Sequence, residues 1–391
     1  MIRHLSKNHT VVVGSLAHTL EELKQGSGLK EHCEEVLAEV LPKSVRWTQA
    51  ARALFSFRPS SVAYFWSASL RRQIEKAALR HAFDAVIVHC AFAAQYAIGI
   101  PAKFRLLDFG DLDSGKWFDY EKFRGFPLCH GYGLEARKLR SYEKKVAENF
   151  NYCTLTTAGE LEEFKNLGLG LPHSVIPNGV DTSYFHPNRR SDNGAPIIVF
   201  VGRMDYFPNI DGAEYFARNI FPIIRRQIPH AELRVVGSNP NHAVRNLAMI
   251  PGIRVTGHVA DVRPYLMDAT VAVAPLRLAR GTQNKILESM AMGVPVVTTS
   301  EAAKGVDAIP EQHVLIGDTP AAFARQVIRI LKDGKLRTDL SKAGPERVEQ
   351  VHSWPRSMVL LDMILDRSNR PGIADPCNRL ATLRNSETVA R

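Results

Sequence analysis

The sequence predicts an α/β protein made of two doubly wound, Rossmann-like domains, each a parallel sheet covered by helices on both faces. Three observations predict this fold class. The chain has 391 residues, which favours two domains over one. Its second half alternates short apolar, β-branched segments with amphipathic helical patterns, as buried parallel strands and their crossover helices do. Its first half repeats the same alternation less regularly.

The second half has the clearer pattern. Strands are predicted at 196–201, 232–236, 253–256, 270–275 and 294–298, and helices at 211–227, 261–268, 282–292 and 321–332. Because these strands are short and nearly all apolar, we expect them to be parallel and buried on both faces. Their carboxyl ends then meet along one edge of the sheet, where ligands bind in doubly wound domains.

In the first half, strands are predicted at 10–13, 44–47, 85–89, 104–109, 153–156 and 174–176, and helices at 70–81 and 134–149. The polar segment 188–195 is the predicted linker. The expected organisation is an N-terminal Rossmann-like domain over 1–188, a C-terminal Rossmann-like domain over 189–350, a helix over 351–367 crossing back to the first domain, and a disordered tail over 368–391. We expect a ligand cleft between the two domains.

The chain opens in a helix-like segment at 1–7, and a strand follows it. A doubly wound domain usually begins with a strand, a glycine-rich turn and a helix. We therefore expect the first strand and its turn to be missing from this sequence. Either the true start lies upstream of Met1, or this form of the protein is impaired.

The composition is typical of a soluble globular protein, with 45% hydrophobic and 23% charged residues. Neither a membrane-spanning run of ~20 apolar residues nor a signal peptide is evident, so a cytoplasmic location is expected. The five cysteines show no Cys-x-x-Cys pair, which argues against a disulfide or zinc framework. The formal charge of +10 suits anionic partners, such as a nucleotide diphosphate or an acidic membrane surface. No motif supports a nucleic-acid partner.

The first candidate ligand residues follow the strand that ends at Val201. Gly202 permits a sharp turn, and Arg203 then projects from the carboxyl edge of the sheet. A guanidinium at this edge suits a diphosphate, because its planar fork matches phosphate oxygens. The alternative is that Arg203 pairs with a carboxylate across the edge.

The segment 279–293 has the stronger pattern. It follows a strand, turns at Gly281 and opens a helix for which Thr282 is a plausible N-cap. A helix N-terminus attracts anions. Lys285 lies in the first turn, and Glu288 lies on the same face three residues later, so the cation can bind phosphate while the carboxylate accepts from ribose hydroxyls. The alternative is a surface ion pair between these two residues.

The first half offers weaker candidates. His89 ends the strand at 85–89, where a histidine can orient a substrate or carry a proton, although lone histidines are more often structural. Asp111, Asp113 and Ser114 follow the next strand. They can bind a metal or an acceptor hydroxyl, or Asp113 or Ser114 can cap the following helix.

Together these motifs resemble the retaining glycosyltransferases of family 4. The resemblance rests on Val-Ile-Pro-Asn-Gly-Val-Asp at 175–181, Val-Gly-Arg-Met-Asp-Tyr with Pro-Asn at 201–209, Val-Thr-Gly-His-Val with Asp-Val at 255–262, and the block from 285 to 297. More narrowly, 108–117 and 279–288 resemble the sugar transferases found with PEP-CTERM/exosortase exopolysaccharide systems.

The resemblance implies a GT-B fold and hexosyl transfer with retention, from a UDP- or GDP-sugar to a hydroxyl acceptor. That acceptor would be a saccharide, possibly lipid-linked, in exopolysaccharide or other cell-surface glycan synthesis at the inner membrane face. No cofactor or metal is implied, because protein cations would stabilise the leaving diphosphate. Arg203 and Lys285 would hold the diphosphate, Glu288 the ribose, and His89 would lie near the donor sugar and acceptor. The other implied residues are Gly202, Asn209, Gly257, His258, Val259, Arg280, Gly281 and Thr282 for the donor, and Asp111, Asp113 and Ser114 for the acceptor.

One departure from the family pattern concerns position 280. Many relatives carry a pair of glutamates with seven residues between them; Glu288 matches the second, but Arg280 stands in place of the first. The donor sugar therefore stays open. Two other functions also stay open, namely an N-terminally truncated, catalytically impaired donor-binding protein and a GT-B nucleotide-sugar epimerase, which would need further acids or histidines around the sugar.

Overall fold

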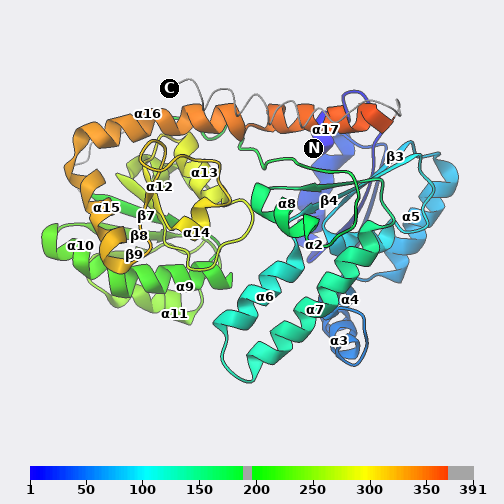
Figure 1. Ribbon diagram of the computed structural model, residues 1–391, viewed down its shortest axis with the longest axis horizontal. Helices are drawn as coiled ribbons and strands as arrows, with labels where there is room; N and C mark the ends of the chain where they lie inside the picture. Colours follow the sequence, from blue (N-terminus) through cyan, green and yellow to red (C-terminus); the bar gives the residue numbers. More distant parts are fainter. Residues whose placement is uncertain (188–195, 369–391) are drawn as a thin grey trace. The chain divides into compact units, whose positions relative to one another are not determined.

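The computed structural model describes residues 1–187 and 196–368. They divide into two compact units: unit 1 comprises Met1–Ile176 with the C-terminal residues from Met358 onward, and unit 2 comprises Pro177–Ser357. The segment expected to be a linker, 188–195, falls inside unit 2 and lies outside the described residues, as does the tail from 369. Each unit is an α/β domain whose strands are all parallel (Figure 1), which confirms the predicted fold class.

Unit 2 contains a six-stranded sheet in the order β12-β11-β10-β7-β8-β9. Its strands are β7 (Ile197–Val201), β8 (Glu232–Val236), β9 (Ile253–Val255), β10 (Val271–Ala274), β11 (Val296–Thr298) and β12 (Leu315–Ile316). Strands β8 and β9 add on one side of β7 and the later strands on the other, so the order reverses between β7 and β10. This reversal is a topological switch point, the place where doubly wound sheets bind ligands.

Helices cover both faces of this sheet (Figure 1). On one face, α15 (Pro320–Lys332) packs on a continuous helical segment that consists of α9 (Phe207–Tyr215), η3 (Phe216–Ile220) and α10 (Phe221–Gln227). On the other face, α13 (Asn284–Ala291) packs on α16 (Gly334–Val351), and α12 (Arg263–Asp268) lies nearby. Shorter helices are α11 (His242–Asn246), η4 (Leu247–Met249) and α14 (Ser300–Ala303). One hydrophobic core unites these layers. All five strands predicted here are present, whereas two-residue β12 was too short to predict.

Unit 1 contains two parallel sheets. The strands β1 (Val12–Ala17) and β2 (Glu35–Val40) form a pair, and β3 (Ala85–His89), β4 (Phe104–Gly110), β5 (Tyr152–Leu155) and β6 (His173–Val175) follow one another in a four-stranded sheet. The strand predicted at 10–13 corresponds to β1, and β2 was not predicted.

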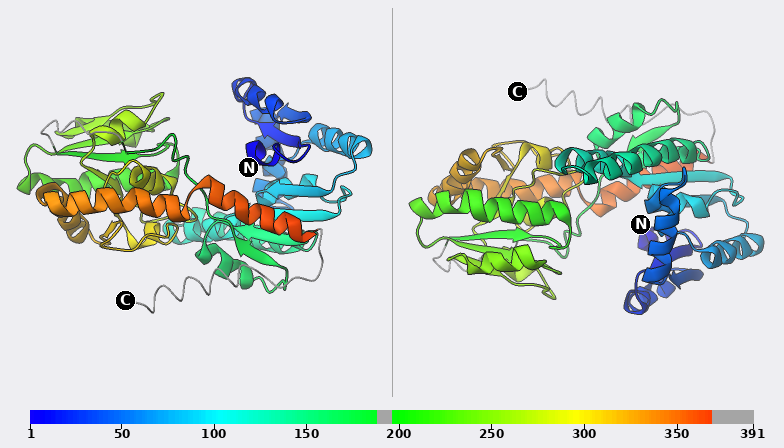
Figure 2. Two further views of the ribbon diagram at one scale, coloured as in Figure 1. Left: turned by 90° about the horizontal axis from the view of Figure 1, so that it is seen from above. Right: turned by 90° about the horizontal axis from the view of Figure 1, so that it is seen from below.

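Strand β4 shows how this sheet is covered. Leu107 and Phe109 face a core built with η2 (Ala91–Tyr96), α7 (Leu128–Ala147) and α8 (Ala158–Lys165). Phe104 and Leu106 point to the opposite face and pack on α1 (Ile2–Leu5) and the second half of α17 (Trp354–Ser368), whose Leu361 is fully buried. The alternation follows from the two-residue repeat of a strand. The views in Figure 2 show α1 and α17 from above and below.

The remaining helices of unit 1 are α2 (Leu20–Gln25), η1 (Gly26–Glu31), α3 (Lys43–Leu54), α4 (Ser60–Tyr64), α5 (Ala68–Arg80) and α6 (Asp113–Phe123). The strand predicted at 44–47 is wrong, because these residues lie in α3. The β-branched and aromatic side chains suggested a strand there, but Arg46, Ala50 and Ala53 recur at helical spacing and are the buried residues of that helix. Over the described residues, no helix is both long and apolar enough to span a membrane.

Candidate functional site

The predicted ligand residues of unit 2 lie on loops at one edge of its sheet. Gly202 and Arg203 follow β7, Gly257 and His258 follow β9, and Gly281 lies in the loop after β10. Because all six strands are parallel, these loops leave the same edge, and the loops after β7 and β10 flank the switch point.

Asn209, at the start of α9, bridges the two loops of the switch point. Its amide nitrogen donates to the carbonyl oxygen of Arg203 at 2.9 Å, and its amide oxygen accepts from Nζ of Lys285 at 2.7 Å. Asn209 is buried. A Cβ on Gly202 would come within 2.8 Å of its amide nitrogen, so glycine there makes room for the bridge. Asn209 was predicted to touch the donor, and in this structure it positions Arg203 and Lys285.

Lys285 is a half-buried cation with few neighbours of opposite charge. Burial lowers its pKa to about 8, against a weaker opposing effect from Glu288. Its ammonium lies 5.8 Å from the centre of the Phe200 ring. Burial likewise raises the pKa of Glu288. Among the described residues no ion pair joins Lys285 to Glu288, so the surface-pair alternative is not observed. An anion that reached Lys285 would gain from this low-dielectric setting.

Arg203 is exposed and does pair with a carboxylate. Its Nη2 lies 3.0 Å from Asp205, and its Nε also donates to that carboxylate at 3.3 Å. Arg203 lowers the pKa of Asp205, which also accepts from Asn239. An exposed ion pair contributes at most about 1 kcal/mol. Arg203 can therefore exchange this partner for a diphosphate at little cost.

The N-terminus of α13 differs in detail from the prediction. The helix begins at Asn284 with Gln283 at the N-cap position, and no side chain of the described residues caps it, so the prediction of Thr282 as N-cap is wrong. The amide of Gln283 instead donates to the carbonyl of Arg280 at 2.9 Å. The Thr282 hydroxyl oxygen is buried and lacks a hydrogen-bond partner among the described residues. Free backbone donors and this hydroxyl together can receive an anion.

The loop 280–282 depends on two glycines. Gly281 has a φ of +60°, a region that side chains rarely adopt. A Cβ on Gly305 would lie 1.8 Å from the Gly281 carbonyl oxygen, which is closer than any real contact. Only glycine at 305 therefore allows the loop to lie where it does.

The loop after β9 provides the third predicted group. Gly257 has a φ of +73°, His258 is exposed, and Val259 packs partly against the unit 2 core. Strand β9 lies two places from β7 in the sheet, which is roughly 10 Å at the usual strand spacing. The loop is thus set apart from the switch point along the same edge.

In unit 1, His89 ends β3 and is held by the neighbouring strand. Its Nδ1 lies 2.8 Å from Asp108, and the other carboxylate oxygen of Asp108 accepts from the hydroxyl of Thr154 at 3.0 Å. Asp108 raises the pKa of His89 to about 10, with a smaller contribution from Cys90. His89 is therefore an exposed cation at neutral pH, better suited to orienting an anionic or hydroxyl group than to accepting a proton.

This coupling predicts a large change in Asp108→Asn. Without the carboxylate, the His89 pKa is expected to fall toward the ordinary value of about 6.5. A titration followed by imidazole NMR signals would measure it. The matched control is Asp84→Asn, which removes an exposed acid paired with Lys103. An unchanged His89 titration in Asp108→Asn would show that the carboxylate does not hold the proton.

Asp111, Asp113 and Ser114 lie at the start of α6, but neither Asp113 nor Ser114 caps it. Residue Leu112 occupies the N-cap position, and the backbone N–H groups of Leu112 and Ser114 are bound by acids from other helices. Those acids are Glu160, which accepts from Leu112 at 2.8 Å, and Glu143, which accepts from Ser114 at 2.9 Å. The prediction that Asp113 or Ser114 caps this helix is therefore wrong.

These contacts also decide which of the three residues can face a ligand. Ser114 is buried and donates its hydroxyl to Glu143, so it does not present that group to an acceptor. Asp111 accepts from Thr156 at 2.7 Å, and burial raises the pKa of Asp113. Both aspartates are partly exposed. They remain the acceptor-side candidates of unit 1.

Glu143 predicts a measurable pH dependence of stability. Burial raises its pKa to about 7. Because the folded-state pKa of Glu143 lies above the unfolded value, its protonated form stabilises the folded protein. This stabilisation is fully present below about pH 4.5, and on the order of 2 kcal/mol of it is lost as pH rises through 7. In Glu143→Gln, whose amide can keep both contacts to Ser114, this loss should vanish. Urea unfolding at pH 5 and pH 8 measures it, with exposed Glu148→Gln as the control. An equal loss in both variants would contradict the assignment.

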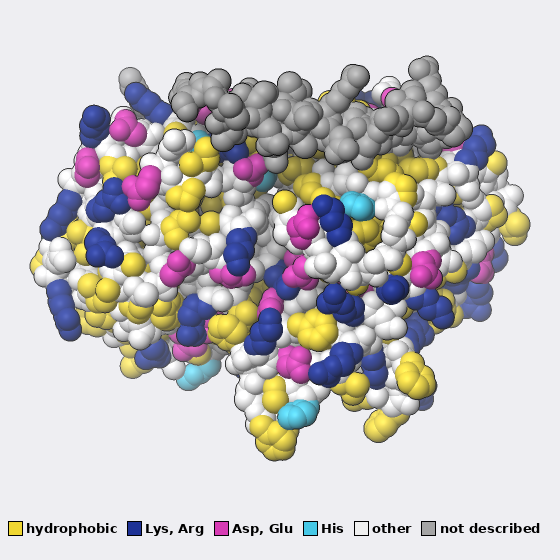
Figure 3. All heavy atoms as spheres, viewed as in Figure 1, with side chains coloured by type: hydrophobic (Ala, Val, Ile, Leu, Met, Phe, Trp, Pro, Cys, Tyr) yellow, Lys and Arg dark blue, Asp and Glu magenta, His cyan; other side chains and the backbone are white. Residues whose placement is uncertain are grey.

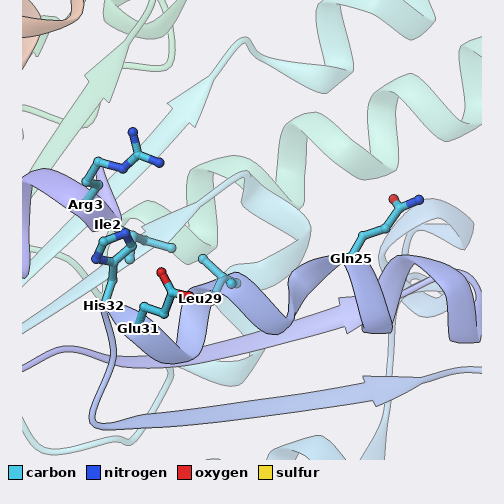
Figure 4. Close-up of a pocket in the computed structure, with 7 residues that line it drawn as sticks. Ile2, Arg3, Gln25, Leu29, Glu31 and His32 are labelled. Carbon is cyan, nitrogen blue, oxygen red and sulfur yellow. The ribbon is translucent and has the colours of Figure 1, made fainter. Parts of the chain in front are cut away.

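Other features of the surface do not compete with these loops. Among the described residues, no group of three His, Cys, Asp or Glu side chains is arranged to hold a metal ion. A hollow in unit 1 (Figure 4) is lined by α1 and by η1, where Ile2, Arg3, Leu29, Glu31 and His32 meet. A second hollow in unit 2 involves residues 230–232 and 252–254. Both hollows are lined by residues that precede strands or lie at the starts of strands. The candidate residues lie instead at the carboxyl ends of the strands.

Comparison with known proteins identifies the part of the chain that carries the unit 2 site. Residues 195–333 match the family model described as Glycosyl transferases group 1. Unit 2 carries a glycosyltransferase group 1 domain. The matched range contains Arg203, Lys285 and Glu288. No curated protein matches the chain.

Solved structures extend the likeness to both units. Sucrose-phosphate synthase from Thermosynechococcus elongatus is 18% identical with a TM-score of 0.63, over 86% of this chain and 84% of that one. Anabaena HepE, solved with UDP and glucose, is 12% identical with a TM-score of 0.65, over 93% and 94%. S. aureus TarM, solved with UDP, is 14% identical with a TM-score of 0.58, over 77% and 58%. At these identities the likeness establishes the fold, which is that of GT-B glycosyltransferases with Rossmann-like domains.

Together the domain match and the fold confirm the prediction of a glycosyltransferase enzyme. Sequence reasoning missed two glycines of its site. Gly237 follows β8, and a Cβ there would lie 1.8 Å from the Gly202 carbonyl oxygen; a glycine directly after a buried strand was an available signal. Gly305 gave no local signal, because the backbone it must avoid is far away in sequence.

Proposed function

We propose that the protein transfers a sugar, with retention of anomeric configuration, from a UDP- or GDP-sugar to a hydroxyl acceptor. The observation that carries the proposal is the bridge Lys285–Asn209–Arg203 at the switch point of the unit 2 sheet. It holds one half-buried and one exposed cation beside an uncapped helix N-terminus. This combination suits a diphosphate, since both cations and the backbone donors bind phosphate oxygens.

The donor then lies along the carboxyl edge of the unit 2 sheet. Arg203, Lys285 and the donors of 281–282 bind the diphosphate, and Glu288 accepts from ribose hydroxyls. The loop at Gly257–Val259 receives the base, two strands away from the diphosphate. Support comes from relatives of the same fold that were solved with UDP, namely HepE and TarM.

The chemistry needs the leaving diphosphate to be stabilised as its bond to the sugar breaks. Arg203 and Lys285 supply positive charge there, so the transfer proceeds without a required metal or other cofactor. The cationic His89, together with Asp111 and Asp113, orients the donor sugar and the acceptor hydroxyl. Arg280 takes the place of a sugar-facing acid and contributes to donor-sugar selection.

The acceptor in this proposal is a growing, lipid-linked saccharide of exopolysaccharide or other cell-surface glycan synthesis. The protein works in the cytoplasm as a peripheral protein at the inner membrane face. Its charge of +10 supports attraction to an anionic surface.

Isothermal titration of the full chain with UDP and with GDP, in the presence of EDTA, tests the donor site. Binding of either nucleotide is expected, and binding of neither would refute the proposal. Binding that needs added Mg²⁺ would refute its metal-free part. Turnover assays then separate the functions: transfer supports the proposal, whereas binding without turnover favours a donor-binding protein, and interconversion of sugars without acceptor favours an epimerase.

A further inference from the structure

Unit 1 carries exposed phenylalanines on two projecting turns. In the α3–α4 loop, Phe55 is 94% and Phe57 is 100% exposed, and in the α6–α7 turn Phe126 is 84% exposed. Leu54 and Leu128 flank them and are also exposed. We define these five residues as the aromatic tip surface. Large apolar side chains held this fully in water usually mark a contact surface.

The two turns project on the same side of unit 1. Figure 1 shows α3 and the α6–α7 turn as two separate projections on the lower side of that unit, the side that the right-hand view of Figure 2 shows from below. In Figure 3, hydrophobic side chains form the projecting ends, with Lys and Arg side chains beside them.

Helix α7 fixes the α3–α4 loop at both ends. Nζ of Lys138 donates to the carbonyl oxygens of Ala53 and Leu54 at 3.2 and 3.1 Å, at the end of α3. The buried carboxylate of Glu135 accepts from the backbone N–H groups of Ser60 and Ser61 at 3.0 and 2.8 Å, at the start of α4. The exposed loop is therefore held in place by specific contacts.

The α3–α4 side of this surface is basic, whereas near the α6–α7 turn Lys122 lies 3.4 Å from Asp119 of the same helix. The segment 43–67 contains four basic residues, Lys43, Arg46, Arg52 and Arg58, and no acid. Lys43 and Arg52 are exposed. Lys122 is also exposed, next to the α6–α7 turn. Basic side chains that surround projecting aromatic ones match an anionic lipid surface, where each basic group adds attraction and each ring enters the interface.

We propose that the aromatic tip surface docks the protein on an anionic phospholipid bilayer. The phenylalanines insert at the headgroup–acyl boundary while Lys43, Arg52 and Lys122 contact lipid phosphates. Separate convex tips suit a deformable bilayer better than a protein partner, which needs a continuous complementary patch of roughly 800 Å². This inference gives a location to the membrane contact of the proposed function and lies apart from the donor site.

Vesicle flotation of the full chain tests the proposal, with phosphatidylcholine vesicles that contain or lack phosphatidylglycerol. The wild type is expected to float only with the anionic vesicles. Phe55→Ser with Phe57→Ser should lower the partition coefficient about tenfold or more, since two rings no longer enter the interface. The matched control is Leu79→Ser with Met249→Ser, which removes two equally exposed apolar side chains (89% and 84%) elsewhere and should leave partitioning unchanged.

A second variant tests the charges. Lys43→Glu with Arg52→Glu should abolish the preference for anionic vesicles while thermal unfolding stays as in the wild type. Absence of flotation by the wild type, or equal losses in tip and control variants, would overturn the proposal. So would a tip variant that changes only the monomer–dimer equilibrium, since the surface would then join two copies. UDP and GDP titrations of the tip variant should match the wild type, so this test and that of the donor site fail independently.

Discussion

Lys285→Met is expected to weaken binding of the nucleotide diphosphate by about 100-fold or more. The substitution keeps a flexible chain of similar length but removes the half-buried cation of the switch point. A charge-assisted hydrogen bond to a diphosphate oxygen in a desolvated site is among the strongest single contacts available, and truncating one partner of such a charge pair costs about 2–5 kcal/mol of binding free energy. Titration calorimetry with UDP and GDP measures the change.

The pH profile separates this role from a structural one. Only the ammonium form of Lys285 attracts the diphosphate, and its pKa of about 8 means that the ammonium is lost as pH rises through 8. Wild-type affinity should therefore fall between pH 7 and pH 9, and the variant's affinity should stay flat. Lys304→Met, which removes an exposed lysine paired with Glu301, is the control. Equal affinity in Lys285→Met and the wild type would remove Lys285 from the donor site.

Gly305→Ala is expected to reduce nucleotide affinity by about 30-fold or more although residue 305 touches no donor in the proposed arrangement. The added methyl would meet the Gly281 carbonyl at 1.8 Å, so the 280–282 loop must move away from it. A shift of about 1 Å in that loop misplaces the donors at the start of α13, and errors of this size cost about 10²-fold in comparable cases. Binding is again measured by calorimetry, with thermal unfolding in parallel.

The matched substitution is Gly334→Ala, where the nearest atom to the new methyl is the end of the Arg337 side chain at 3.7 Å. It should leave both affinity and stability close to those of the wild type. If Gly305→Ala binds nucleotide as well as Gly334→Ala does, the position of the 280–282 loop does not matter for the donor.

The sequence was most informative where structure is local. Strands β7, β10 and β11 are short, buried and almost entirely apolar runs, and a run of that kind predicts a buried parallel strand without knowledge of its partners. Arg203 could be predicted for the same reason, because it directly follows the turn after β7, and Lys285 because it lies in the first turn of the helix that follows β10. The order of parallel strands then decides that their loops meet at one edge.

What could not be predicted depends on residues far apart in the chain. Thr282 looked like a helix cap, but the loop geometry at Gly281 places Gln283 there instead. Similarly, Ser114 was predicted as a possible cap of α6, but both its N–H and its hydroxyl donate to Glu143, which is far away in sequence. Glu143 did give a signal, an acid within the apolar stripe of α7 formed with Leu139 and Val146, and such an acid needs a partner.

The central claim is that a nucleotide diphosphate binds at the switch point of the unit 2 sheet. Hydrogen–deuterium exchange of the full chain with saturating UDP or GDP tests it most directly, because protection marks the backbone that the ligand covers or orders. We predict protection at 202–209 and 280–288, reduced in Lys285→Met at the same nucleotide concentration. Protection confined to unit 1, or none at these two segments when calorimetry shows binding, would contradict the claim.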